Sequence, residues 1–286
     1  MTPAGRKVGV ALGGGGVRGL GHIPALEAID HHGIRPDALS GTSMGAIIAA
    51  LYASGKSGHE IRNLVAQHSV TRDDGILDLY AKKDSLMKWL DAVRIAWTGS
   101  GLLRADGFLR HLTDQMEVRR FEQLSIPLKV VATDFYTGEA VIFESGPILP
   151  ALEASMSIPG IFVPVEYRGR LLVDGGVSNN LPYDILSDDC DMTIAVDVSP
   201  TRVRKEAEPP SMIDASLGMF DLLVDRVTRS MIEAKAPDIY FHPRIVGIRV
   251  LEFDKAEEVF RQVDQCMGDF NQLLSELVDK DSESTD

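Results

Sequence analysis

Ser43 has the sequence surroundings of a catalytic nucleophile. It is the centre of Gly41-Thr42-Ser43-Met44-Gly45, a G-x-S-x-G pattern between a short apolar run and a longer one. Between a strand and a helix, such a turn strains the serine and exposes its hydroxyl at the helix start, where the helix dipole favours a developing negative charge. The small residues Gly41 and Gly45 let strand and helix pass closely. The alternative is an ordinary Gly-Ser turn that caps a helix.

A serine hydroxyl needs a base to become a strong nucleophile, and Asp174 is the best candidate. An apolar run, LLV, predicts a buried strand that ends at this aspartate, and two glycines follow. Shielding from water raises the pKa of a carboxyl from its usual value of about 3.9, which makes the carboxylate a better base. The alternative is a turn aspartate that caps the next segment. Among the histidines, only His242 lies late enough for the order Ser, Asp, His, and its neighbouring proline favours a structural role.

A glycine-rich loop precedes the serine, and three ligands compete for it. Gly14, Gly16 and Gly19 match the dinucleotide fingerprint, but no acidic residue ends the second predicted strand to hold a ribose. A Walker phosphate loop ends in Gly-Lys-Ser or Gly-Lys-Thr, whereas this loop ends in Arg18-Gly19. The remaining interpretation is an oxyanion hole, whose backbone N–H groups face the negative oxygen of a reacting ester. Arg18 would orient the loop or direct charge toward a substrate phosphate.

The elements that must position these residues alternate along the chain. Strands are predicted over 7–12, 37–41, 127–135, 140–145, 169–176 and 191–199, and helices over 18–33, 43–54, 211–234 and 254–279, with a more polar helical stretch between 56 and 125. The segment 140–145 is the hairpin partner of the strand before it. Strands that alternate with helices indicate an α/β fold with a largely parallel sheet.

Composition limits the function classes. The chain has 286 residues, is 44% hydrophobic and carries a net charge of −13. That charge argues against nucleic acid and against steady attraction to anionic lipid, although brief apolar contact stays open. Cys190 and Cys266 fit no metal spacing and are expected to be buried reduced thiols. With no signal sequence and no membrane span, we expect a soluble cytoplasmic protein.

Both tryptophans lie in one segment, residues 85–103. Trp97 and three aliphatic residues repeat there at helical spacing, and Trp89 lies nearby. Tryptophan suits a boundary between apolar and wet surroundings, so one interpretation is a lid or interfacial patch that admits lipid. The pattern favours the other interpretation, an amphipathic helix packed on the core.

Together, these blocks resemble the patatin-like phospholipase family. GGGGVRG resembles its oxyanion loop, GTSMG its nucleophile elbow and DGG the aspartate of its Ser–Asp dyad, in the family's order. The segments VVATDFYTGE and SMSIPGIFVPVEYRGRLLVDGGVSNNLP are also similar to the family. The resemblance covers about residues 8–200. The segment GHIPALEAI resembles the corresponding helix of the single-domain bacterial branch that is related to neuropathy target esterase.

The resemblance implies a three-layer α/β/α sandwich in one domain over 1–286, with C-terminal helices over 211–279. It implies a serine acyl hydrolase that works through an acyl-enzyme, with Ser43 as nucleophile, Asp174 as base, and no cofactor or metal. The residues that would supply or frame the oxyanion hole are Gly14, Gly15, Gly16, Arg18 and Gly19.

The expected substrate is a phospholipid or lysophospholipid, met at the inner face of a membrane through transient contact. Two alternatives stay open: a soluble carboxylesterase or thioesterase with the same dyad, and a non-catalytic regulatory protein that keeps the fold. The oligomeric state also stays open.

Overall fold

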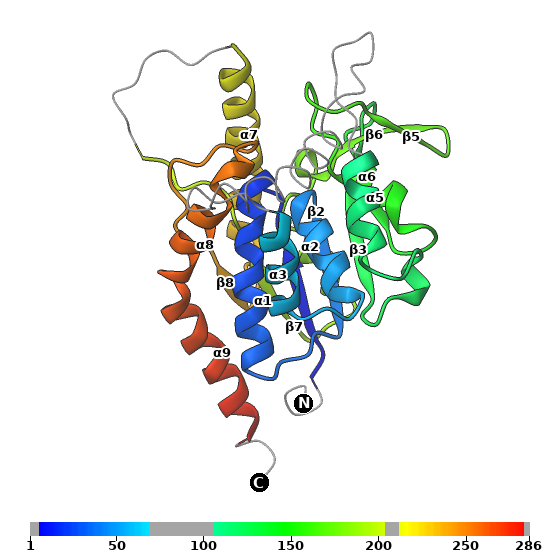
Figure 1. Cartoon of the computed structure of the whole chain (residues 1–286). Helices are drawn as coiled ribbons and strands as arrows, with labels where there is room; N and C mark the ends of the chain where they lie inside the picture. The colour runs from blue at the N-terminus through cyan, green and yellow to red at the C-terminus, as the bar shows by residue number, and fades with distance from the viewer. Residues whose placement is uncertain (1–5, 69–105, 204–211, 283–286) are drawn as a thin grey trace, which may run out of the picture.

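The computed structural model describes residues 6–68, 106–203 and 212–282 (Figure 1). In this part of the chain the strands are β1 (Val8–Leu12), β2 (Ala38–Thr42), β3 (Leu128–Asp134), β4 (Ala140–Phe143), β5 (Val165–Tyr167), β6 (Arg170–Asp174), β7 (Met192–Val196) and β8 (Ile239–Phe241). The α-helices are α1 (His22–His31), α2 (Met44–Ala53), α3 (Gly58–His68), α5 (Asp106–Asp114), α6 (Ile148–Ser155), α7 (Met212–Ala234), α8 (Ala256–Asp264) and α9 (Met267–Ser282). Short 3-10 helices cover Gly16–Gly21, Phe121–Gln123, Gly175–Val177, Asp184–Leu186 and Phe253–Lys255.

The strands form one sheet in the order β5-β6-β3-β2-β1-β7-β8, with β4 paired to β3. The pairs β3–β2, β2–β1, β1–β7 and β7–β8 are parallel, whereas β4, β5 and β6 pair in antiparallel fashion. The centre of the sheet is therefore parallel, which confirms the fold class expected from the alternation of strands and helices. All residues of β1 and β2 are buried, as is typical of strands covered on both faces.

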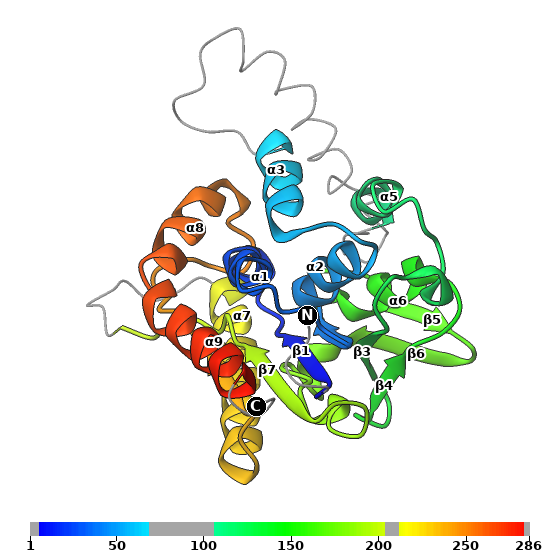
Figure 2. The same cartoon turned by 90° about the horizontal axis from the view of Figure 1, so that it is seen from below.

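The two faces of the sheet are covered unequally. Helices α1, α2 and α6 lie on one face (Figure 2). Their side chains contribute to the larger apolar core, and α2 is buried around its whole circumference. On the other face, Leu181 and Leu186 pack against Ala11 of β1, with Ile232 of α7 at the edge of this smaller cluster. The second outer layer of the sandwich is thus a short 3-10 segment and one long helix. None of the helices in the described ranges is long and apolar enough to cross a membrane.

Several elements differ from the sequence-based prediction. The helix predicted over 18–33 begins as the 3-10 helix Gly16–Gly21, and α-helical structure starts only at His22. The helix predicted over 254–279 is divided into α8 and α9, and between them the Cys266 N–H donates to the Val263 carbonyl in a tighter turn. The sequence patterns do not predict α6 or β5, and a strand of three residues is too short to show an alternation.

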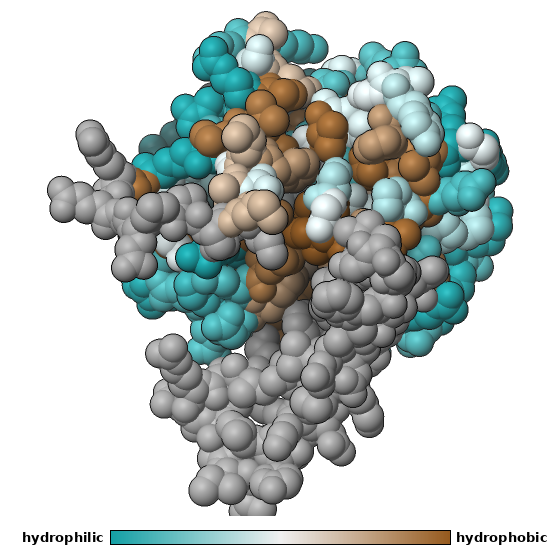
Figure 3. Space-filling view, turned by 90° about the horizontal axis from the view of Figure 1, so that it is seen from above, coloured by the Kyte–Doolittle hydropathy of each residue, from teal (hydrophilic) through white to brown (hydrophobic). Residues whose placement is uncertain are grey.

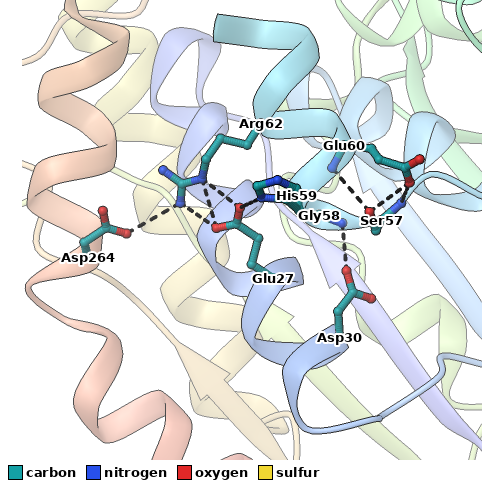
Figure 4. A network of polar contacts seen from close by, with 8 residues as sticks. All are labelled: Glu27, Asp30, Ser57, Gly58, His59, Glu60, Arg62 and Asp264. Carbon is teal, nitrogen blue, oxygen red and sulfur yellow. Dashed lines mark hydrogen bonds and ion pairs between the residues drawn. The ribbon is translucent and has the colours of Figure 1, made fainter.

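A polar network fastens α3 to α1 and α8 (Figure 4). Arg62 of α3 forms ion pairs with Glu27 of α1 (2.6 Å) and with Asp264 of α8 (3.6 Å). Asp30 of α1 accepts a hydrogen bond from the Gly58 N–H at the start of α3 (2.7 Å). Since α1 follows the glycine-rich loop in the sequence, this network also helps to hold the helix into which the loop leads.

Candidate active site

Ser43 occupies a strained turn between β2 and α2. Its φ of 54° and ψ of −124° lie in a region that L-residues rarely adopt. A side chain at Gly45 would clash with the carbonyl oxygens of Leu12 and Gly13, and one at Gly41 would clash with the start of α2. Both glycines of the predicted elbow therefore lie where the backbones approach too closely for any other residue.

The register of β3 brings Ser43 and Asp174 together. Val131 pairs with Thr42 at the end of β2, and the next residue, Ala132, pairs with Asp174 at the end of β6. Since β4 occupies the opposite edge of β3 at both positions, β2 and β6 must meet end to end along the remaining edge. Ser43 directly follows Thr42, so it lies beside Asp174, and both residues line one pocket.

The Asp174 carboxyl is only 2% exposed. Its Oδ1 accepts a hydrogen bond from the Gly176 N–H (2.7 Å), and its Oδ2 has no partner within the described ranges. Burial raises the pKa of Asp174 to about 7, against the opposing effects of Gly176 and of the nearby Ser43 hydroxyl. The Ser43 hydroxyl lies close enough to influence this pKa, although the two side chains do not form a full hydrogen bond.

Helix α6 and the turn that follows it hold both backbones in place. The Ser43 N–H donates to Ser155 Oγ (2.8 Å) at the end of α6. The Asp174 N–H donates to the carbonyl oxygen of Ser157 (2.9 Å). Sequence reasoning missed both supports, although they stand in the SMSIPG stretch that carries part of the family resemblance.

The glycine-rich loop leaves two backbone donors unused. The Gly14 N–H donates to the Asn180 carbonyl (3.0 Å), and the Arg18 N–H donates to the Gly15 carbonyl (3.2 Å). The N–H groups of Gly15 and Gly16 have no acceptor in the described part of the chain, and both residues line the pocket. The N–H groups of Gly14 and Arg18 therefore stabilise the loop itself, whereas those of Gly15 and Gly16 remain available to a bound group in the pocket.

Two further contacts fix the course of this loop. Gly16 has a φ of 58°, and a side chain there would clash with the Val250 carbonyl, which accepts the Val17 N–H at 2.9 Å. A side chain at Gly19 would clash with the Met44 side chain, next to the candidate nucleophile. The loop is thus held between the segment at Val250 and the start of α2.

The Arg18 side chain lines the pocket and is bound to helix α7. Its guanidinium, 2% exposed, forms a two-point ion pair with Asp221 of α7 (2.9 and 3.2 Å) and donates to the Ile248 carbonyl. Phe220 and Val224, on either side of Asp221 in the sequence, also line the pocket. Of the two roles expected for Arg18, this arrangement favours orientation of the loop. Helix α7 was not linked to the site by any sequence signal.

The remaining predicted residues lie elsewhere. His242 places Nδ1 3.0 Å from the carbonyl oxygen of Asp197 and is absent from the pocket lining. Trp89, Trp97 and the whole segment 85–103 lie outside the described residues. In the described ranges, no group of three or more His, Cys, Asp or Glu side chains is arranged to hold a metal ion.

Apolar side chains are also exposed on elements that follow or flank the residues of the pocket. Figure 3 looks onto the end of the molecule where the parallel strands finish, and apolar residues gather over the middle of this face. Phe135 and Tyr136, after β3, are 54% and 79% exposed, and Val177, just after Asp174, is 42% exposed. Met219 and Leu223 of α7 are 60% and 62% exposed.

Comparison with known proteins identifies the family. A family model described as patatin-like phospholipase matches residues 10–187, a range that contains both Ser43 and Asp174. The chain belongs to the patatin-like phospholipase family. The resemblance to this family that was read from the sequence is thereby confirmed.

Individual relatives extend the comparison. An uncharacterised NTE family protein of Mycobacterium tuberculosis is 32% identical over 233 residues, which is 77% of this chain and 59% of the relative. Lysophospholipase NTE1 of Kluyveromyces lactis is 27% identical over 303 residues, covering 96% of this chain and 20% of that protein. Among solved structures, VipD from Legionella pneumophila is similar with a TM-score of 0.49 at 13% identity, covering 92% of this chain and 67% of that one.

Proposed function

We propose that this chain is a lipid acyl hydrolase in which Ser43 is the nucleophile and Asp174 the base. The observation that carries the proposal is a serine in a strained elbow beside a buried carboxyl whose pKa is raised to about 7. Membership of a family named for phospholipases supports the reaction class, and one relative bears the name lysophospholipase.

In the proposed mechanism, Asp174 accepts the hydroxyl proton while Ser43 Oγ attacks the acyl carbonyl carbon. The carbonyl π electrons move to oxygen and give a tetrahedral oxyanion. Its collapse breaks the ester C–O bond, and the leaving alcohol takes the proton from Asp174. Water then attacks the acyl-enzyme, Asp174 accepts one of its protons, and collapse releases the fatty acid and returns the proton to Ser43 Oγ.

The N–H groups of Gly15 and Gly16 are the proposed donors to the oxyanion. They are the two loop N–H groups that lack an acceptor in the described residues and lie in the pocket lining. The start of α2 adds the positive end of a helix dipole at Ser43. One donor of this kind typically contributes about 3 kcal/mol to transition-state stabilisation.

The proposed substrate is a phospholipid or lysophospholipid presented at a lipid surface. The exposed apolar residues around the pocket, among them Tyr136 and Leu223, suit transient contact with such a surface. The net charge of −13 favours lipids with zwitterionic or neutral head groups over anionic ones. The same charge also favours the second candidate, a hydrolase of water-soluble acyl esters or thioesters.

A substrate comparison separates these functions. Fatty acid release is measured from lysophosphatidylcholine micelles, phosphatidylcholine vesicles, p-nitrophenyl butyrate and palmitoyl-CoA, with Ser43→Ala as the control. The proposal expects the highest kcat/KM on a lipid, with activity abolished in Ser43→Ala. Higher kcat/KM on the butyrate or the thioester favours the second candidate. No turnover of any of these by folded protein contradicts both and favours the non-catalytic alternative.

A further inference from the structure

Three consecutive carbonyl groups of the glycine-rich loop each accept a hydrogen bond. The Gly13 carbonyl oxygen is bound by His22 Nε2 (2.7 Å), that of Gly14 by Asn180 Nδ2 (3.4 Å), and that of Gly15 by the Arg18 N–H (3.2 Å). A trans peptide unit is planar, with its C=O and its following N–H pointing in opposite directions. Each bound carbonyl therefore sets the direction of the next residue's N–H group.

Asn180 holds Gly14 at two points. Its carbonyl oxygen accepts the Gly14 N–H (3.0 Å), and its side-chain amide donates to the Gly14 carbonyl. The side chain is buried (3% exposed) and stands six positions after Asp174 in the sequence. By fixing the Gly14 carbonyl, Asn180 fixes the direction of the Gly15 N–H, the first of the two unused donors.

His22 holds the preceding peptide unit. Its ring is fully buried, and because a carbonyl can only accept, Nε2 must carry the proton. Burial lowers the pKa of His22 to about 4, so the ring is neutral near neutral pH. The Gly13 carbonyl that it binds lies against Gly45 of the elbow, so His22 also sets the distance between the loop and the nucleophile turn.

We propose that Asn180 and His22 are positioning residues of the oxyanion hole, which hold the peptide units of Gly13 and Gly14 so that the Gly15 N–H points at the reacting oxygen. This inference rests on the proposed function. Neither side chain transfers a proton. Because the hole acts on charge that develops only in the transition state, losing the alignment lowers kcat and leaves KM unchanged.

The first test compares neighbouring asparagines. Asn180→Leu removes the amide donor at similar volume. Asn179→Leu is the matched control, since Asn179 is equally buried but donates to Asp184. Removing an oxyanion donor outright lowers kcat about 100- to 1000-fold. We expect misalignment to lower kcat about 10- to 100-fold in Asn180→Leu, with KM and the pH midpoint unchanged, and Asn179→Leu to stay near the wild-type kcat.

A second test substitutes His22, and it applies even if Asn180→Leu does not fold. His22→Gln retains an N–H donor and His22→Leu does not. The control His32→Leu removes the bond between a histidine just after α1 and the Asn271 side chain, away from the loop. We expect kcat to fall in His22→Leu, to recover partly in His22→Gln and to persist in His32→Leu.

Equal kcat losses in His22→Leu and His22→Gln would overturn the inference, as would a raised KM with unchanged kcat or a wild-type kcat in Asn180→Leu. Failure of the proposed function itself is seen separately, because wild-type protein would then not react with a fluorophosphonate at Ser43.

Discussion

The guanidinium of Arg18 and the carboxylate of Asp221 join the glycine-rich loop to helix α7 through two hydrogen bonds. Both residues line the pocket, and the Arg18 side chain is buried whereas that of Asp221 is 19% exposed. The pair therefore forms part of the pocket wall. Its two members come from opposite ends of the chain, 203 residues apart. The position of α7 over the pocket is thereby tied to the loop that carries the proposed oxyanion donors.

Breaking this pair is expected to destabilise the protein. Asp221→Ala leaves a buried guanidinium without its partner, and removing one member of a buried pair typically costs about 3 to 5 kcal/mol, less here because Asp221 is partly exposed. Asp225→Ala is the control, since Asp225 pairs on the same helix with Arg229, which is 63% exposed. Urea denaturation measures both. Equal stability of the two variants would contradict the structural importance of the pair.

Asp174 is expected to lower stability at the pH where it would work. Its folded pKa of about 7 lies above the unfolded value, so its favourable contribution is full below about pH 4 and is lost as pH rises through 7. The difference of about 3 units corresponds to roughly 4 kcal/mol. Asp174→Asn should therefore be inactive but more stable than wild type at about pH 8. Denaturation of both proteins between about pH 5 and pH 8 measures this, and a variant less stable than wild type at pH 8 would contradict it.

His22 titrates in the opposite sense. Its folded pKa of about 4 lies below the unfolded value of 6.5 because the ring is buried, although the charge of Asp197 opposes the shift. Its contribution is full above about pH 6.5 and is lost as pH falls through 4, roughly 3 kcal/mol in total. His22→Gln, which cannot titrate, should lose less stability than wild type between pH 7 and pH 4. Identical pH dependence of unfolding in the two proteins would show that burial does not hold the ring neutral.

The backbone strain at Ser43 gives a fourth stability prediction. Holding a non-glycine residue in such a conformation typically costs about 1 to 3 kcal/mol of folding free energy. A glycine removes this strain, but part of the gain is lost because glycine has more conformational entropy in the unfolded state. Ser43→Gly and Ser43→Ala both remove the hydroxyl, but only glycine relieves the strain. We expect Ser43→Gly to be more stable by about 1 kcal/mol in equilibrium denaturation. If alanine were equally stable, the elbow would not be strained in solution.

Local patterns made part of this site predictable. Ser43 and Asp174 each stand at the end of an apolar strand beside glycines, and both signals lie within a few residues. The supports of the site are not local. Ser155 binds Ser43 across 112 residues, and the Asn180 side chain binds Gly14 across 166. Such contacts depend on strand order and register, and no spacing in the sequence encodes them.

The fold shows the same division. The parallel centre of the sheet follows from apolar strands of five to seven residues that alternate with helices, whereas β5 has three residues and leaves no periodicity to detect. The sequence also does not predict that β2 and β6 meet end to end along β3. At that point the parallel partner β2 is followed by the antiparallel partner β6, and no local pattern marks the change.

The central claim, that Asp174 activates Ser43, is tested most directly by the rate of fluorophosphonate labelling. Intact mass is followed over time for wild type, Ser43→Ala and Asp174→Asn across about pH 5 to 9, with His242→Ala as the control for a histidine base.

We expect one adduct on wild type, with a rate that rises through about pH 7 as the Asp174 carboxyl loses its proton. Ser43→Ala should carry no adduct, Asp174→Asn should react at least about 100-fold more slowly, and His242→Ala should match wild type. Labelling lost in His242→Ala but retained in Asp174→Asn would contradict the Ser–Asp assignment.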